Sequence, residues 1–380
     1  MKYVLLTRAK KNVGDFLILD RAKRLIKKYK GKDFIVLQSW KPLDNYLKII
    51  NDSDAVIICG GPGIQPNFYP NVYPLIKNLE DISVPIILFG IGWCGFPGDD
   101  VSLKLFRFTS TSLMALRKIC DSYPIISCRD YLTAKVLVDN GFTKVLMTGC
   151  PSWYVLEYLD KPFKPPDKIE KVVFTVPQRV NYHGQAIGVM RLLKKMFPNA
   201  ELICSFHRGW RSDKYTSRME AERLSSLRRA ALNLGFRVVN AAYDISKIEF
   251  YKDCDLHVGY RLHGHIYFLS YRKPSFLLSE DSRGIAFSKT LGLPSIQAWE
   301  LSRLGEFYSK LIGNVKLPFT IADFAESMRR RLVKASYRAV NELKQLLQKE
   351  LESGFEQFND LEKVFRKHFE KVVRFLKSLP

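Results

Sequence analysis

Short apolar runs alternate with amphipathic stretches over residues 1–150. The apolar runs cover residues 3–7, 34–39, 55–59, 85–90, 125–128 and 144–148. Each run is short and rich in Val, Ile and Leu, as buried strands are. Between them, residues 16–29 and 131–141 carry apolar side chains at helical spacing. This alternation predicts an α/β fold in which helices cover a parallel sheet.

The same pattern restarts after a proline-rich segment at residues 160–167, where helices and central strands are disfavoured. Further strands are expected at residues 171–176, 201–206, 237–240, 256–258 and 275–278, and helices at 185–196, 214–234 and 264–272. We therefore predict two doubly wound, Rossmann-like domains, over residues 1–160 and 169–318. A cleft would lie between the carboxyl ends of their strands, where open α/β sheets bind ligands.

Residues 319–380 form a C-terminal helical extension in this interpretation. Apolar residues recur there at i, i+3 and i+4, with Lys, Arg and Glu on the other faces: Leu343, Leu346, Leu347, Leu351, Leu361, Val364, Phe365, Phe369, Val372, Val373 and Leu376. We expect a pair of helices packed on the two domains. A basic amphipathic helix resting on anionic lipid is the alternative.

The composition indicates a folded protein with a strong excess of positive charge. Of the 380 residues, 47% are hydrophobic, and 60 Lys and Arg outnumber 38 Asp and Glu, giving a formal net charge of +22. The hydrophobic content excludes a disordered chain. The charge favours nucleic acid, an anionic membrane surface or acidic small substrates as partners, although a solvated Lys-rich surface would give the same total.

The cysteines and the apolar runs indicate the cellular compartment of the protein. Seven scattered cysteines without a Cys-x-x-Cys pair argue against a disulfide framework or a zinc ribbon. The chain opens without a signal-peptide pattern. The longest uncharged run, residues 82–98, contains two prolines and four glycines and is a poor membrane span. We therefore expect a cytoplasmic protein.

Polar and glycine residues follow several predicted strands of the first domain. Asn12, Gly14 and Asp15 open the first helix, whose N-terminus offers free N–H groups to an anion or a hydroxyl. Glycines that would let a ligand approach the main chain follow the third and fourth strands, namely Gly61, Gly63 and Gly92. Arg129 ends the fifth strand, and its planar cation suits a carboxylate or a phosphate. Tight turns and helix capping would account for the same residues.

The second domain carries a denser set of chemically active side chains. His207 and Asp213 follow a predicted strand and could hold a substrate hydroxyl. The strand at 256–258 leads into Arg261 and His263, which suit anion binding next to proton transfer because an imidazole titrates near neutrality. Further candidates on the same two strand ends are Leu262, Gly264, Glu280 and Arg283.

Six motifs together have the order found in a known family. They are Asn12-x-Gly-Asp15, Gly60-Gly-Pro-Gly63, Gly90-Ile-Gly92, Ser127-x-Arg-Asp130, Gly149-Cys-Pro151 and Arg261-Leu-His263-Gly. This ordered set resembles the polysaccharide pyruvyl transferase family. The resemblance implies a GT-B-like fold. It also implies transfer of the enolpyruvyl unit of phosphoenolpyruvate to a sugar, giving a pyruvate ketal and phosphate.

In that chemistry we expect Arg129 and Arg261 to hold phosphoenolpyruvate and His263 to protonate its methylene carbon. Asn12, Asp15, His207 and Asp213 would contact the sugar or glycan acceptor or shape its pocket. No metal and no cofactor are expected, since phosphoenolpyruvate is the donor substrate. A second hypothesis is that the acceptor is anionic or lipid-linked and that the positive surface contacts the inner face of an anionic membrane.

Two other functions remain open at this point. A GT-B glycosyltransferase could hold a nucleotide-sugar diphosphate with the same glycine turns and Arg–His pair. A nucleic-acid-binding protein would fit the charge, but no basic stripe interleaved with aromatics and no known module is present, so no nucleic acid is expected as partner.

Overall fold

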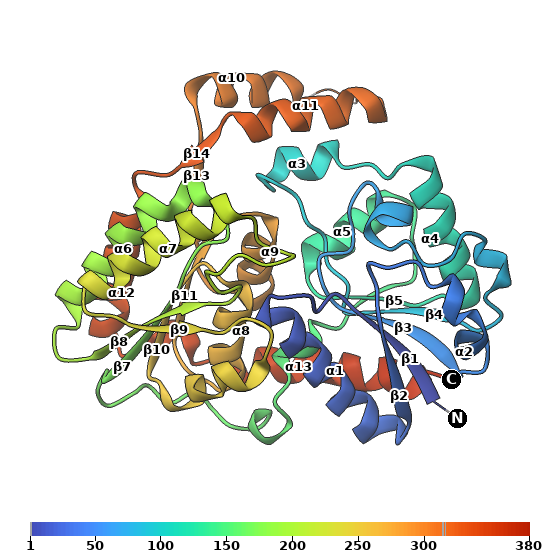
Figure 1. The fold of residues 1–380 in the computed structure, drawn as a ribbon, viewed down its shortest axis with the longest axis horizontal. Helices are drawn as coiled ribbons and strands as arrows, with labels where there is room; N and C mark the ends of the chain where they lie inside the picture. Colours follow the sequence, from blue (N-terminus) through green and yellow to red (C-terminus); the bar gives the residue numbers. More distant parts are fainter. Residues whose placement is uncertain (1, 314, 316) are drawn as a thin grey trace.

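Two parallel sheets lie side by side in the computed structural model, which describes residues 2–313, 315 and 317–380 (Figure 1). The first sheet has the order β2-β1-β3-β4. Its strands are β1 (Lys2–Thr7), β2 (Asp33–Gln38), β3 (Ala55–Cys59) and β4 (Ile86–Phe89). The parallel pair β5 (Ile126–Cys128) and β6 (Val145–Met147) continues it beyond β4, because the Ile91 amide donates to the Ser127 carbonyl at 3.0 Å.

The second sheet has the order β12-β11-β10-β7-β8-β9. Its strands are β7 (Lys171–Thr175), β8 (Glu201–Phe206), β9 (Arg237–Asn240), β10 (Leu256–Gly259), β11 (Ser275–Ser279) and β12 (Ile296–Gln297). All of its pairs are parallel. A separate antiparallel pair joins β13 (Trp299–Leu301) to β14 (Val333–Ala335).

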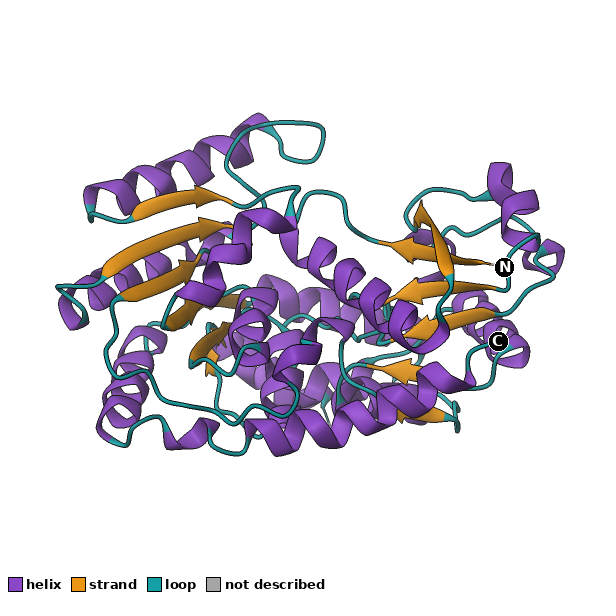
Figure 2. Cartoon of the chain, turned by 90° about the horizontal axis from the view of Figure 1, so that it is seen from below, coloured by secondary structure: helices purple, strands orange, loops and turns teal. Residues whose placement is uncertain are grey.

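Helices cover the faces of both sheets (Figures 1 and 2). They are α1 (Val13–Lys30), α2 (Leu47–Asn51), α3 (Asp100–Leu105), α4 (Ser110–Ser122), α5 (Tyr131–Asp139), α6 (His183–Met196), α7 (Arg218–Asn233), α8 (Leu262–Ser270), α9 (Ser282–Leu291), α10 (Arg303–Ile312), α11 (Phe319–Arg331), α12 (Ala339–Glu352) and α13 (Leu361–Ser378). None of the helices in the described part of the chain is long and apolar enough to cross a bilayer.

The strands bury alternate side chains in different cores because successive residues of a strand point to opposite faces. In β1, Tyr3 and Leu5 belong to the core that contains residues of α1 and α13. Val4 and Leu6 belong to the core under α4 and α5. Strands buried on both faces explain the continuous apolar runs in the sequence.

The predicted strands all occur, and three short ones were not predicted. β12, β13 and β14 have only two or three residues each. Periodicity cannot be recognised over so short a segment, so their pairing depends on tertiary contacts. The extension predicted as helical from residue 319 therefore contains the strand β14.

The last two helices divide between the two sheets. α12 packs on α6 and β12, whereas α13 packs on α1 and β6. Phe375 of α13 stacks on Phe89 of β4 with ring centroids 5.4 Å apart. The hydroxyl of Tyr3, in β1, donates to the carbonyl of Pro380. The expectation of a helical pair packed on the two domains is confirmed.

The N-terminal end of α1 is held by the second domain. The amide of Val13 donates to the carbonyl of His207 at 3.1 Å, and the amide of Tyr243 donates to the carbonyl of Lys11 at 2.9 Å. Val13 and Leu17 lie in a core shared with Phe268 of α8. The first turn of α1 is thereby fixed against the carboxyl ends of the second sheet.

Candidate functional site

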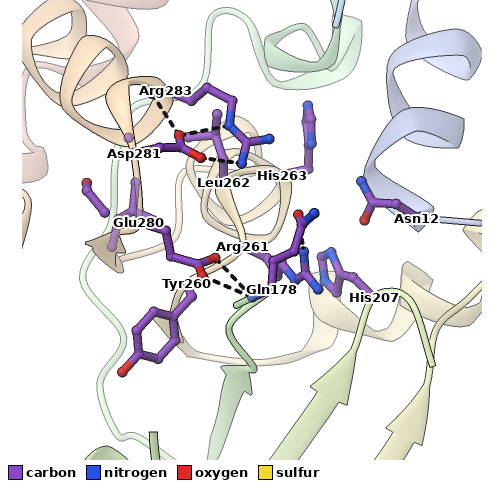
Figure 3. A pocket seen from close by; sticks show the side chains of 13 residues that line it. Asn12, Gln178, His207, Tyr260, Arg261, Leu262, His263, Glu280, Asp281 and Arg283 are labelled. Carbon is purple, nitrogen blue, oxygen red and sulfur yellow. Dashed lines mark hydrogen bonds and ion pairs between the residues drawn. The ribbon is translucent and has the colours of Figure 1, made fainter. Parts of the chain in front are cut away.

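Two adjoining cavities lie where the carboxyl ends of the strands face each other. The inner cavity, of about 30 Å³, is lined by Asn12, Gln178, His207, Tyr260, Arg261, Leu262, His263, Leu277, Ser279, Glu280, Asp281, Arg283 and Gly284 (Figure 3). The cationic cavity, of about 380 Å³, is lined by Arg8, Lys10, Lys11, Asn12, Asp15, Pro62, Gln178, Arg208, Tyr215 and Arg283. The two share Asn12, Gln178 and Arg283, so they form one continuous cleft between the domains.

Arg261 is positioned by a chain of hydrogen bonds that crosses the second sheet. Its amide donates to Thr175 Oγ1 at 3.1 Å, and that hydroxyl is 2.9 Å from His257 Nε2. His257 Nδ1 is in turn 2.7 Å from Ser275 Oγ. β11, β10 and β7 each contribute one member, and the main chain of Arg261 is therefore fixed just before α8 begins.

The guanidinium of Arg261 is held in the cleft by Gln178. Arg261 Nη1 donates to Gln178 Oε1 at 3.0 Å, while its buried Nε has no partner among the described residues. Burial lowers the pKa of Arg261 to about 10, and Glu280 opposes that shift. The group stays charged at neutral pH and can offer further N–H donors to an anion.

Glu280 stabilises the loop after β7. Its carboxylate accepts hydrogen bonds from the amide of Gln178, at 3.0 and 3.1 Å, and from the amide of Arg179 at 3.0 Å. Burial raises the pKa of Glu280, whereas Arg261 and the two amides act in the opposite direction. Glu280 is thus engaged in holding Gln178, which in turn holds Arg261.

Arg283 is fixed by a two-point ion pair. Its Nε donates to Asp281 Oδ1 at 2.8 Å and its Nη2 to Asp281 Oδ2 at 2.6 Å. Asp281 also caps α9, since it accepts a hydrogen bond from the Arg283 amide. Burial opposes ionisation of both groups, but their mutual attraction lowers the pKa of Asp281 and raises that of Arg283. The guanidinium lines both cavities as a permanent cation.

His263 lies directly opposite the first turn of α1. A Cβ built on Gly14 would come within 2.4 Å of His263 Nδ1, which no side chain tolerates. Only glycine therefore allows α1 to approach α8 this closely. In Figure 3, Asn12 points from the start of α1 toward the cavity that His207, Arg261 and His263 line.

Both histidines of the inner cavity are neutral in the ligand-free protein. Burial, followed by the charges of Arg129, Arg283 and Arg261, lowers the pKa of His263 to about 3. Burial and Arg261 lower the pKa of His207 well below its usual value, and its Nε2 lies 3.0 Å from Tyr251 Oη. Both pKa values would rise if an anion offset the nearby guanidinium charges.

Several buried polar atoms of the inner cavity have no hydrogen-bond partner in the described part of the chain. They are Asn12 Oδ1, His207 Nδ1, Arg261 Nε, His263 Nε2 and Ser279 Oγ. Buried polar groups without partners cost free energy. Their concentration at one place indicates that a polar ligand would supply the missing partners.

The cationic cavity gathers positive charges from both domains. Among the described residues, Arg8, Lys10 and Arg208 form no ion pair within 4.0 Å with a carboxylate. Burial, followed by the charge of Arg8, lowers the pKa of Lys10. The carboxylate of Asp15 accepts from Asn12 Nδ2 at 3.3 Å, and burial raises its pKa. A polyanionic ligand would relieve the repulsion between these cations.

Arg129 lies outside the lining of both cavities. Its side chain is 1% exposed, and it donates to Asp130 Oδ2 at 3.2 Å and to the carbonyl of Trp93 at 3.1 Å. A Cβ on Gly92 would collide with its Nε, so Gly92 makes room for the guanidinium. Arg129 therefore acts on the cleft by its electrostatic field, since its positive charge helps to lower the pKa of His263.

The remaining predicted residues also lie outside the lining of both cavities. Gly61 and Gly63 pack against Arg8 and Tyr73, and Gly264 packs against His257 and Thr175. Asp213 forms an ion pair with Lys11 at 2.8 Å. The structure thus brings together on the cavity walls Asn12, Asp15, His207, Arg261, Leu262, His263, Glu280 and Arg283.

Several lining residues were not predicted, notably Gln178, Asp281, Arg8 and Lys10. A positional signal existed for each, because Arg8 and Lys10 follow β1, Gln178 follows β7 and Asp281 follows β11, all at carboxyl ends of strands. Residue type alone did not distinguish them from surface residues. Among the described residues, no cluster of His, Cys, Asp and Glu has the arrangement of a metal site, and all seven cysteines are free thiols.

Solved structures with the same fold include one in complex with UDP and one in complex with UDP-GlcNAc. The S. aureus MnaA–UDP structure aligns with a TM-score of 0.53 at 11% identity, over 99% of this chain and 96% of that one. The UDP-GlcNAc 2-epimerase of Neisseria meningitidis, bound to UDP-GlcNAc, aligns with a TM-score of 0.51 at 11% identity, over 99% of both chains. These likenesses confirm the GT-B-like α/β fold. No curated protein matched the chain.

Comparison with protein families gives a match that covers most of the cleft. Residues 12–282, from the start of α1 to the start of α9, match the family described as polysaccharide pyruvyl transferase. The matched segment contains both strand ends that supply Arg261, His263 and Glu280. The chain therefore belongs to the polysaccharide pyruvyl transferase family.

Proposed function

We propose that the protein transfers the enolpyruvyl unit of phosphoenolpyruvate to two hydroxyls of a sugar, forming a pyruvate ketal and releasing phosphate. The observation that supports this most is the meeting of Arg261, Arg283 and His263 on one cavity that opens into the cationic cavity. Two fixed guanidinium groups next to an imidazole suit a small molecule with a carboxylate and a phosphate.

Phosphoenolpyruvate would bind at the junction of the two cavities, where Arg283 is shared. Arg261 is already oriented by Gln178, and Arg283 by Asp281, so neither guanidinium has to be ordered when the ligand binds. Arg8, Lys10 and Arg208 add positive charge on the wider side of the cleft. This arrangement also stabilises the negative charge that develops as phosphate leaves.

His263 would act as the general acid. In the free protein its pKa of about 3 makes it neutral near pH 7. The negative charges of the donor would offset Arg129, Arg261 and Arg283, so the imidazole could take up a proton in the complex. It would then deliver this proton to the methylene carbon, which becomes the methyl group of the ketal.

The remaining steps form two C–O bonds at the central carbon of the donor. The first sugar hydroxyl adds there and loses its proton as the methylene carbon is protonated. The bond to the phosphate oxygen then breaks, and phosphate departs with the electron pair. The second hydroxyl attacks the resulting oxocarbenium carbon and loses its proton, closing the ring. Asn12 and His207 line the cavity where these hydroxyls could be bound.

The test is to incubate the full-length protein with phosphoenolpyruvate and a panel of sugars and glycans. Phosphate release and a product heavier by one pyruvate less one water are expected with a suitable acceptor. His263→Gln should lower the rate by about 10²–10⁴-fold, as loss of a general acid does. His183→Gln is the matched control, because His183 lies on α6 outside both cavities.

Retention of the full rate in His263→Gln would contradict the assigned acid. Release of a nucleoside diphosphate from a nucleotide sugar, with no turnover of phosphoenolpyruvate, would contradict the reaction itself and favour the glycosyltransferase alternative. Both donors should therefore be assayed with the same acceptors.

A further inference from the structure

The helical hairpin of α10 and α11 has a feature that the proposed reaction does not use. It lies along one long side of the molecule, above α3 and next to the β13–β14 pair (Figure 1). The chain's amphipathic helices α12 and α13 bury their apolar faces on the two domains. The hairpin instead leaves large apolar side chains in solvent.

These side chains form what we call the apolar ridge. Its members and their exposed fractions are Leu304 (65%), Phe307 (68%), Leu311 (63%), Ile321 (51%) and Phe324 (64%). The first three are spaced i, i+3 and i+7, so they share one face of α10. Ile321 and Phe324 are likewise three residues apart on α11. A cluster of large exposed apolar side chains on one hairpin marks an interaction site.

A buried ion network fixes the opposite side of the hairpin. Arg329 of α11 is 0% exposed and donates to Glu326 Oε2 at 2.7 Å, to Ser309 Oγ at 2.8 Å and to Ser102 Oγ at 3.1 Å. It also pairs with Asp99 beside α3. The network joins α11 to α10 and to the first domain. The ridge is therefore presented outward by a rigid support.

Cations border the ridge. Arg303 precedes Phe307 by four residues and Lys310 follows it by three, so both are its neighbours on the surface of α10. The exposed charged residues described on α10 and α11 are mostly basic: Arg303, Lys310, Arg330 and Arg331, against Glu306 and Asp323. This charge pattern complements an anionic partner.

We propose that the hairpin docks on an anionic lipid bilayer, with the apolar ridge inserted at the boundary between headgroups and acyl chains. Amphipathic surface helices with basic flanks bind membranes in this way. Pairing with a second copy through the same ridge is disfavoured, because it would bring together two hairpins that carry the same net positive charge. The net charge of +22 adds long-range attraction to an anionic surface.

Flotation of the full-length protein with vesicles tests this inference. Binding is expected with vesicles of phosphatidylcholine and phosphatidylglycerol, and much less with phosphatidylcholine alone. The double variant Phe307→Glu/Phe324→Glu should bind the anionic vesicles at least about tenfold more weakly. The matched control is Met114→Glu/Val138→Glu, which adds the same charge at apolar residues that are 70% and 56% exposed on α4 and α5.

The outcomes separate the possible occupants of the ridge. Equal binding by the wild type and the ridge variant, or no binding of the wild type to either vesicle, would overturn the proposal. So would a wild-type dimer, detected by light scattering, that the ridge variant abolishes without any vesicle binding. Unchanged circular dichroism and unchanged transfer to a water-soluble acceptor would show that the ridge variant keeps its fold and cleft.

Discussion

The two walls of the cleft carry charge in different ways. On the C-terminal wall, Arg283 is paired with Asp281, and Glu280 accepts from two main-chain amides. On the N-terminal wall, Lys11 is paired with Asp213 of the second domain. Arg8 and Lys10 beside it have aromatic and carbonyl neighbours but no carboxylate within 4.0 Å in the described part of the chain. Paired charges are held in one geometry, whereas unpaired cations gain the most interaction energy when an anionic ligand binds. The C-terminal wall is thus suited to orient reacting atoms, and the N-terminal wall to attract and retain anions.

The largest loss of activity is expected from a substitution on the C-terminal wall. Arg261→Gln removes a buried cation whose main chain and side chain are both positioned. The rate of transfer should fall by about 10²–10³-fold, with a smaller change in KM, because the lost group acts on developing charge. Steady-state phosphate release measures both constants. Arg191→Gln on α6 is the control, and an equally large effect there would show that the loss is not specific to the cleft.

The next effect tests how the two walls meet. Gly14→Ala places a Cβ within 2.4 Å of His263 Nδ1, so α1 or α8 has to shift. We expect kcat to fall by about 10²-fold, as misplacement of a reacting group by an ångström does. Gly184→Ala is the matched helical control, because nothing lies within 4 Å of its Cβ and alanine favours the helix by about 0.5–1 kcal/mol. If both variants were fully active, the close approach at Gly14 would have no role in the reaction.

Substitutions on the N-terminal wall are expected to change activity less. Arg8→Gln/Lys10→Gln removes two unpaired cations and should raise the KM for phosphoenolpyruvate by about 10-fold with kcat nearly unchanged. The KM of the wild type should also rise with salt more steeply than that of the variant. A large loss of kcat at saturating donor would mean that this wall orients the reacting atoms as well, which would remove the distinction between the walls.

The last prediction concerns acid stability and depends on His265, which lies on α8 of the second domain. Burial lowers the pKa of His265 to about 3, and its Nδ1 is 2.7 Å from Ser275 Oγ. Below about pH 6.5 the unfolded chain binds a proton there that the folded chain does not. The free energy of unfolding should therefore fall with falling pH by about 1.4 kcal/mol per pH unit from this residue, down to pH 3.

Urea denaturation at pH 7.5, 5.5 and 4.5 measures this slope. His265→Gln should be less steep than the wild type by that amount, after any loss of stability at pH 7.5 is subtracted. A slope identical to that of the wild type would show that His265 is protonated in the folded protein.

Position along the chain predicted much of the C-terminal wall. Arg261, His263, Glu280 and Arg283 all follow strands, and the carboxyl ends of parallel strands meet at one edge, so their proximity could be inferred before any coordinates were available. The same rule applies to Asn12 and Asp15 after β1. Here the local pattern and the tertiary arrangement agree.

The placement of Arg129 shows where such inference stops. It follows β5 as Arg261 follows β10, yet its guanidinium turns beneath the cavity toward Asp130 and the carbonyl of Trp93. Side-chain direction depends on neighbours that are distant in sequence, and so does the use of Gln178 to hold Arg261. Predicting which wall each cation lies on would need the relative placement of the two domains. Local residue patterns do not give that placement.

The return of α13 to the first sheet has a consequence for biosynthesis. Its aromatic and aliphatic side chains complete the core beneath Tyr3 and Phe89, although these partners leave the ribosome hundreds of residues earlier. The apolar face of the first sheet that α13 covers therefore stays exposed to solvent until translation is nearly finished. A chain terminated before residue 361 would keep this apolar face exposed, and we expect chaperones and proteases to bind it.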